Sequence, residues 1–107
     1  MKYIKRLAES VIKKQEKMFK TILVTGARQV GKITMLKNIK PNINYITLDD
    51  MILNQSAVED PELFLKANKP PIIIDEIQYA PNLLRYIKIA VDNSEKKAMY
   101  YLTGSQQ

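Results

Sequence analysis

Residues 26–34, with the sequence G-A-R-Q-V-G-K-I-T, are of the right types and spacing to hold phosphate groups. Gly26 and Gly31 stand five residues apart, and Lys32 follows the second glycine directly. In such a loop successive backbone N–H groups point at phosphate oxygens, and glycine permits the close approach. The lysine would reach the β- and γ-phosphates. The spacing therefore predicts a phosphate-binding loop for a nucleoside triphosphate.

A second set of chemically useful residues is the acidic pair Asp75-Glu76, which follows the apolar run Ile72-Ile73-Ile74. An aspartate at this place can hold Mg²⁺, and the glutamate after it can orient or activate an attacking water. Taken alone, two acids could simply cap the end of a strand. Together with the glycine loop, the pair indicates a nucleotide site. Thr103 and Ser105 follow a later apolar run and, on their own, could be ordinary turn residues.

The elements that must position these residues alternate between strands and helices. Apolar, β-branched runs predict four strands, and apolar residues at helical spacing predict helices between them. This alternation predicts an α/β fold with a parallel sheet covered on both sides, and ligands bind where the strands end. The predicted strands are 21–25, 44–48, 72–74 and 98–102; the predicted helices are 3–19, 32–39, a short turn in 51–59, one from Asp60-Pro61-Glu62 and one from Pro81-Asn82.

Composition excludes several kinds of chemistry. The 107 residues include no cysteine and no histidine, which rules out disulfides, thiolate metal sites and imidazole catalysis. No apolar run approaches the ~18 residues of a membrane span. Charged residues interrupt the N-terminal region where a signal peptide would be apolar. We therefore expect a cytoplasmic protein that works with carboxylates, lysines, hydroxyls, backbone amides and a recruited ion.

The net charge of +6 belongs mostly to the first twenty residues, which hold seven basic and two acidic side chains. We expect residues 1–20 to form a basic amphipathic helix and residues 21–107 to form a nearly neutral core. The basic helix could contact nucleic acid or an anionic membrane. It could equally dock on the core with its lysines in solvent. The near-neutral core argues against a general nucleic-acid-binding surface.

Three stretches carry a resemblance to a known family. They are G-A-R-Q-V-G-K (26–32), I-I-I-D-E-I-Q-Y-A-P-N-L-L (72–84) and Y-L-T-G-S-Q (101–106). With these stretches the whole chain resembles a prokaryotic family of AAA-type P-loop ATPases that begin with a GxRQVGKTT loop. Members usually carry a C-terminal domain of unknown function. The resemblance implies a three-layer α-β-α sandwich with the strand order 5-1-4-3-2.

The resemblance also implies ligands and roles. ATP and Mg²⁺ would be the cofactors, with Asp75 serving the metal, Glu76 as the catalytic carboxylate and Lys32 acting on the β- and γ-phosphates. Ser105 or Thr103 would sense the γ-phosphate. The positions expected to bind the nucleotide are Gly26, Ala27, Arg28, Gln29, Val30, Gly31, Lys32, Ile33, Thr34 and Ser105.

Two departures from the family pattern shape the expected activity. Ile33 stands where the family has threonine, whose hydroxyl is a direct Mg²⁺ ligand in P-loop enzymes. Thr34 is rotated by about 100° on a helix and is a poor substitute. We therefore expect nucleotide binding with slow or absent hydrolysis.

The second departure is that the sequence stops after its fourth predicted strand, without the family's fifth strand and helical lid. A truncated domain would leave residues 21–25 as an exposed apolar edge open to self-association. The alternative function is then a non-catalytic remnant or interaction module that folds with a partner through that edge.

Overall fold

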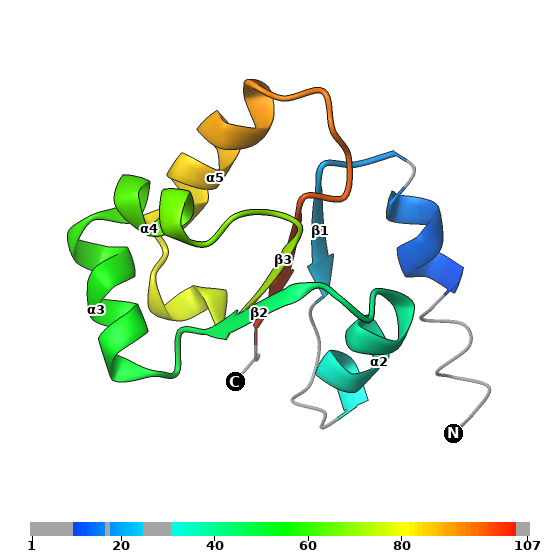
Figure 1. Ribbon diagram of the computed structural model, residues 1–107, viewed down its shortest axis with the longest axis horizontal. Coiled ribbons are helices and arrows are strands. Elements are labelled where there is room, and N and C mark those ends of the chain that lie inside the picture. Colours follow the sequence, from blue (N-terminus) through cyan, green and yellow to red (C-terminus); the bar gives the residue numbers. More distant parts are fainter. Residues whose placement is uncertain (1–9, 17, 25–30, 105–107) are drawn as a thin grey trace.

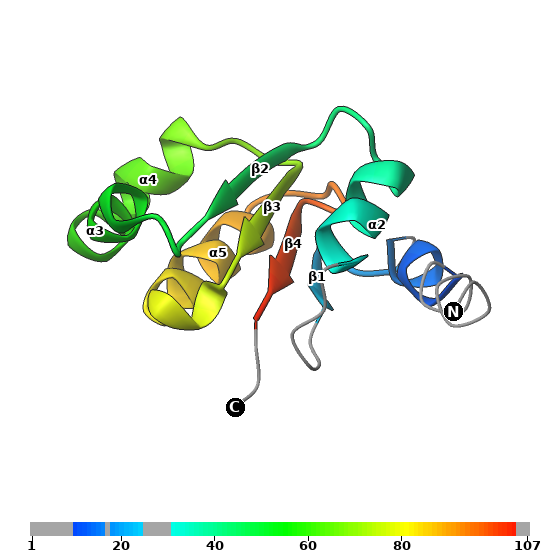
Figure 2. The ribbon, with the colours of Figure 1, turned by 90° about the horizontal axis from the view of Figure 1, so that it is seen from below.

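The computed structural model describes residues 10–16, 18–24 and 31–104, with the backbone alone for residues 31–33. The described residues form one parallel sheet in the order β1-β4-β3-β2. Figure 2 shows the strands side by side with helices on both faces. This confirms the predicted α/β fold and the implied strand order 1-4-3-2. The strands are β1 (Thr21–Val24), β2 (Asn44–Thr47), β3 (Ile72–Asp75) and β4 (Tyr100–Thr103).

The helices alternate with the strands as predicted (Figure 1). A helical segment spans residues 10–16 within the predicted helix 3–19, and the chain turns at Met18. The 51–59 stretch, predicted as a short turn, is helical throughout. No helix in the described ranges is long and apolar enough to cross a membrane. The remaining helices are α2 (Gly31–Ile39), α3 (Met51–Glu59), α4 (Pro61–Ala67), the short 3₁₀ helix η1 (Ile77–Tyr79) and α5 (Leu83–Asp92).

Aspartates fix the beginnings of α3 and α4. The Asp50 carboxylate accepts hydrogen bonds from the backbone N–H groups of Ile52 (2.9 Å) and Leu53 (3.1 Å). The Asp60 carboxylate accepts one from Leu63 (3.1 Å), with Pro61 in the first helical position. Such caps satisfy backbone donors that a helix leaves unpaired at its start. Asp50, which follows β2 closely, therefore has a structural role.

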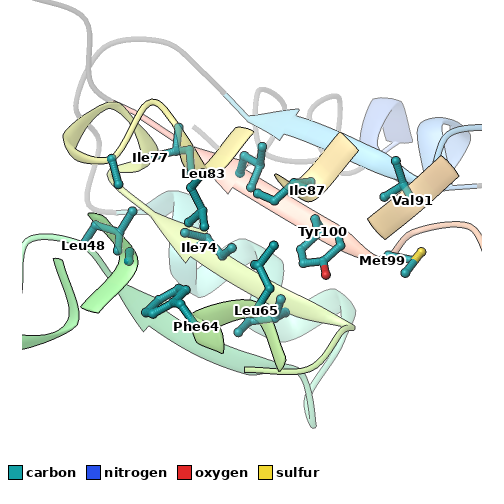
Figure 3. Close-up of a cluster of buried hydrophobic side chains, with 14 residues drawn as sticks. Leu48, Phe64, Leu65, Ile74, Ile77, Leu83, Ile87, Val91, Met99 and Tyr100 are labelled. Carbon is teal, nitrogen blue, oxygen red and sulfur yellow. The ribbon is translucent and has the colours of Figure 1, made fainter. Parts of the chain in front are cut away.

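The larger core lies between the sheet and helices α3, α4 and α5 (Figure 3). Alternate residues of β3 and β4, such as Ile74 and Tyr100, point into it, because side chains along a strand alternate between its two faces. The other alternate residues, Ile73 and Tyr101, face α2 and the 10–16 segment in a second cluster. The two clusters make the three-layer arrangement that places α2 over one face of the sheet.

The 10–16 segment docks on this second cluster. Ile12 is buried there, and the Glu16 carboxylate accepts a hydrogen bond from the Tyr101 hydroxyl and lies 3.8 Å from the Lys40 ammonium. Burial, then the bond to Glu16, raises the pKa of Tyr101. Lys13 and Lys14 are exposed. These contacts show that the 10–16 segment docks on the core with Lys13 and Lys14 in solvent.

The start of β4 is set by the backbone conformation of one residue. The fourth strand was predicted to start at residue 98, but Ala98 has a φ of 55°, which is left-handed, and β4 begins at Tyr100. At the other end of the order, β1 is an edge strand of the described sheet. Its Leu23 side chain is 58% exposed, whereas Ile22 is buried under α2.

Candidate functional site

Asp75 is the last residue of β3, and its carboxylate meets β4 at the carboxyl edge of the sheet. The Thr103 hydroxyl donates a hydrogen bond to Asp75 Oδ1 and accepts one from the Glu76 backbone N–H (3.4 Å). The Thr103 side chain is fully buried. The structure thus brings together three of the residues singled out in the sequence and makes Thr103 the link between them.

Glu76 has an unusual backbone conformation. Its φ and ψ are 59° and 49°, in the left-handed region, and only 6% of the residue is exposed. A non-glycine residue there costs about 1–3 kcal/mol, and such strain concentrates at functional sites. The turn at Glu76 leads directly into η1. Glu76 is therefore a buried acidic residue held in an unusual backbone conformation next to Asp75.

Tyr45 of β2 also reaches Asp75. Its hydroxyl donates a 3.0 Å hydrogen bond to Asp75 Oδ2, the oxygen that Thr103 does not use. Tyr45 pairs in register with Ile73, two residues before Asp75, so both side chains lie on the α2 face of the sheet. Burial, then the bond to Asp75, raises the pKa of Tyr45 to about 12. Tyr45 therefore remains a protonated donor at neutral pH.

Lys37 connects this cluster to α2. It lies in the last turn of the helix, and its ammonium sits 4.5 Å from the centre of the Tyr45 ring. A cation over an aromatic face is attracted by the electron-rich ring. The contacts therefore run from α2 through Tyr45 to Asp75 and on to Thr103, across helix and sheet.

The predicted phosphate loop joins β1 to α2 at this edge. Val24, the last residue of β1, pairs in register with Thr103, and α2 begins at Gly31 with no acidic residue in its first turn. Thr34 is exposed. A helix N-terminus carries partial positive charge and unpaired N–H groups that suit an anion. Gly26, Ala27, Arg28, Gln29, Val30 and Ser105 lie outside the described residues, as do the side chains of Lys32 and Ile33.

Gly104, the residue after Thr103, lies close to the Gln78 side chain of η1. A Cβ on Gly104 would lie 2.9 Å from the Gln78 Oε1 atom of η1. Any side chain at this position would have to displace Gln78. The glycine of the T-G-S sequence thus lets the chain leave β4 close to the segment that follows Glu76.

A single carboxylate, that of Asp75, fits a magnesium ion whose other ligands are waters and phosphate oxygens. Mg²⁺ commonly uses one or two protein carboxylates together with waters and substrate phosphates. An ionised carboxylate has about four lone-pair sites, and Thr103 and Tyr45 each use one. Within the described ranges no three His, Cys, Asp or Glu residues gather as a metal cage.

Tyr45 and Lys37 are the members of this cluster that the sequence patterns did not single out. The available signal was strand parity. Thr47 of β2 pairs in register with Asp75, and side chains two residues apart on a strand share a face. Tyr45, two residues before Thr47, therefore lies on the same face of the sheet as Asp75. The tyrosine side chain is long enough for its terminal hydroxyl to reach Asp75.

We expect Thr103→Val to destabilise the fold by about 1–3 kcal/mol, because it keeps the buried volume but removes the hydroxyl shared by Asp75 and Glu76. For a domain of this size the midpoint of thermal unfolding should fall by roughly 4–8 °C per kcal/mol. Thr103→Ser, which keeps the hydroxyl and loses a methyl group, is the matched variant. A valine variant as stable as wild type would contradict the structural role of the hydroxyl.

Comparison with known proteins identifies a family and two relatives. A family model described as an AAA domain matches residues 18–107. The chain is 31% identical over 85 residues to Uncharacterized protein Rv2008c of Mycobacterium tuberculosis (strain ATCC 25618 / H37Rv) and to Uncharacterized protein Mb2031c of Mycobacterium bovis (strain ATCC BAA-935 / AF2122/97). Each match covers 78% of this chain and 19% of the relative's length. No solved structure matches significantly. The chain therefore belongs to the AAA domain family, a family of ATPase-like nucleotide-binding domains.

Proposed function

We propose that this chain binds ATP in the loop between β1 and α2. The observation that carries the proposal is the Asp75–Thr103–Glu76 cluster at the edge where β1 runs into the loop. The family match supports a nucleotide as the ligand. Backbone N–H groups of residues 26–34 would hold the phosphates, with Lys32 on the β- and γ-phosphates and Ser105 near the γ-phosphate.

The acidic residues have separate tasks. Asp75 would hold Mg²⁺, in most such sites through water, and Glu76 would orient or activate the attacking water. Bound Mg²⁺ supplies charge stabilisation to the phosphate oxygens. Because Ile33 offers no oxygen ligand at the start of α2, we propose that hydrolysis is slow. In the same proposal residues 1–20 form a basic N-terminal segment that includes the helical residues 10–16, and residues 21–107 form the nucleotide-binding core.

The test is a titration of the chain with a fluorescent ATP analogue. We expect saturable binding with a stoichiometry near one, and displacement of the analogue by unlabelled ATP. Binding that never saturates, or that unlabelled ATP does not displace, would overturn the proposal. The nucleotide should also raise the midpoint of thermal unfolding, since a ligand that binds only the folded state stabilises it.

A second candidate is an interaction module that folds with a partner or with another copy of itself. The exposed Leu23 on the edge strand β1 favours it, because an unpaired strand edge can add a further strand. Sedimentation and denaturant unfolding separate the two candidates. A monomer that unfolds cooperatively on its own would contradict the partner-dependent module.

A further inference from the structure

The contacts around Asp75 assign a task to Tyr45 that goes beyond the residues of the phosphate loop. The Tyr45 hydroxyl lies 3.0 Å from Asp75 Oδ2, and the Thr103 hydroxyl is bound to the other oxygen. Two donors from the two strands flanking β3 thus act on opposite oxygens of one carboxylate. This arrangement restricts rotation of the carboxylate about its last torsion angle, which is otherwise broad for aspartate.

Tyr45 is itself held from the other side by α2. The Lys37 ammonium lies 4.5 Å from its ring centre, and Ile73, its partner in register, is buried beneath α2. The tyrosine ring therefore spans the distance between the helix that follows the phosphate loop and the acid at the end of β3. The contacts from α2 to the carboxylate thus run through two side chains, Lys37 and Tyr45.

We propose that Tyr45 is a positioning residue that aims the Asp75 carboxylate at the magnesium accompanying the bound nucleotide, with Lys37 of α2 holding the tyrosine ring in place. The inference rests on the proposed function, since it concerns the same site. Partners that orient metal-binding groups are worth about 10–100-fold in metal affinity. Because Thr103 still restrains Asp75, we expect the lower end of that range for Tyr45.

The test compares the affinity for the fluorescent ATP analogue in MgCl₂ with that in EDTA. Tyr45→Phe removes the hydroxyl and keeps the ring. It should weaken binding about tenfold in MgCl₂ and leave binding in EDTA unchanged. Tyr86→Phe on α5, whose side chain packs on the opposite face of the sheet, is the matched control and should change neither value. Thermal unfolding should be similar for all three proteins.

A second variant tests the link to α2. Lys37→Gln removes the cation over the ring and should weaken the magnesium-dependent part by about twofold to fivefold. In the double variant with Tyr45→Phe, the loss of affinity in MgCl₂ should be smaller than the product of the two single losses, because both residues act through the same contacts.

Each outcome has a distinct meaning. If wild type binds no nucleotide, the proposed function and this inference both fail. If wild type binds with a magnesium-dependent gain, the function stands. If magnesium then raises the affinity of wild type and of Tyr45→Phe by the same factor, the inference alone is overturned. A Tyr45→Phe variant that loses affinity equally in MgCl₂ and in EDTA also overturns it.

Discussion

Lys32→Ala is expected to lower the affinity for the fluorescent ATP analogue by about 10–100-fold. A lysine that contacts the β- and γ-phosphates makes charge-assisted hydrogen bonds, each contributing about 1.5–3 kcal/mol. A difference of 1.4 kcal/mol corresponds to a tenfold change in affinity. Lys32 is the second residue of α2, so alanine should leave the helix intact and remove only the contact. Equilibrium titration in MgCl₂ measures the change.

Lys88→Ala is the matched control for this experiment. Lys88 is exposed on α5, and its removal lowers the net charge by the same amount. If both variants lose affinity equally, the nucleotide is held by the overall positive charge and not by the predicted loop. If neither loses affinity, Lys32 does not contact the phosphates.

Ile33→Thr is expected to give the largest gain. The variant places a hydroxyl at the third residue of α2, where the family pattern has a direct magnesium ligand. Metal-assisted charge stabilisation contributes several kcal/mol to phosphoryl transfer, so phosphate release should rise on the order of 100-fold. The magnesium concentration needed for half-maximal nucleotide binding should also fall. Phosphate release and magnesium titration measure the two effects independently.

Ile33→Val separates the oxygen from the change in shape. Valine and threonine are nearly the same size and are both branched at Cβ, but valine offers no oxygen. Only the threonine variant should gain magnesium affinity. Equal behaviour of the two variants would show that residue 33 does not face the metal. A gain in magnesium affinity without faster phosphate release would place the limiting defect elsewhere in the site.

The sequence patterns located the sheet well because its central strands are continuous apolar runs. Ile72-Ile73-Ile74 is buried on both faces, as such a run requires in a parallel sheet. Alternation of strands and helices then left few possible topologies. The ends of elements were harder to predict where a non-glycine residue adopts a left-handed backbone conformation. β4 starts two residues late because Ala98 is left-handed, and η1 follows the left-handed turn at Glu76.

The position of Asp75 was predictable because the apolar run before it ends at this aspartate, and the structure places it at the end of β3 beside Thr103. The use of an aspartate after a strand was not predictable from its residue type, since Asp50 follows β2 and caps α3.

The Tyr45–Asp75 contact could not be predicted from spacing along the chain. Because it joins two strands, it depends on their register and on the tyrosine rotamer, which residue types do not fix.

The pairing of β1 with β4 has a consequence for how the chain is built during synthesis. Thr21 pairs with Tyr100, so β1 is made before β4 and can pair with it only after β4 has left the ribosome. By contrast, β2 and β3 are closer in sequence and pair directly. Contacts between distant residues slow folding because the chain must first close a long loop. The strand that leads into the predicted phosphate loop is therefore translated before its partner strand, and its pairing requires the closure of a long loop.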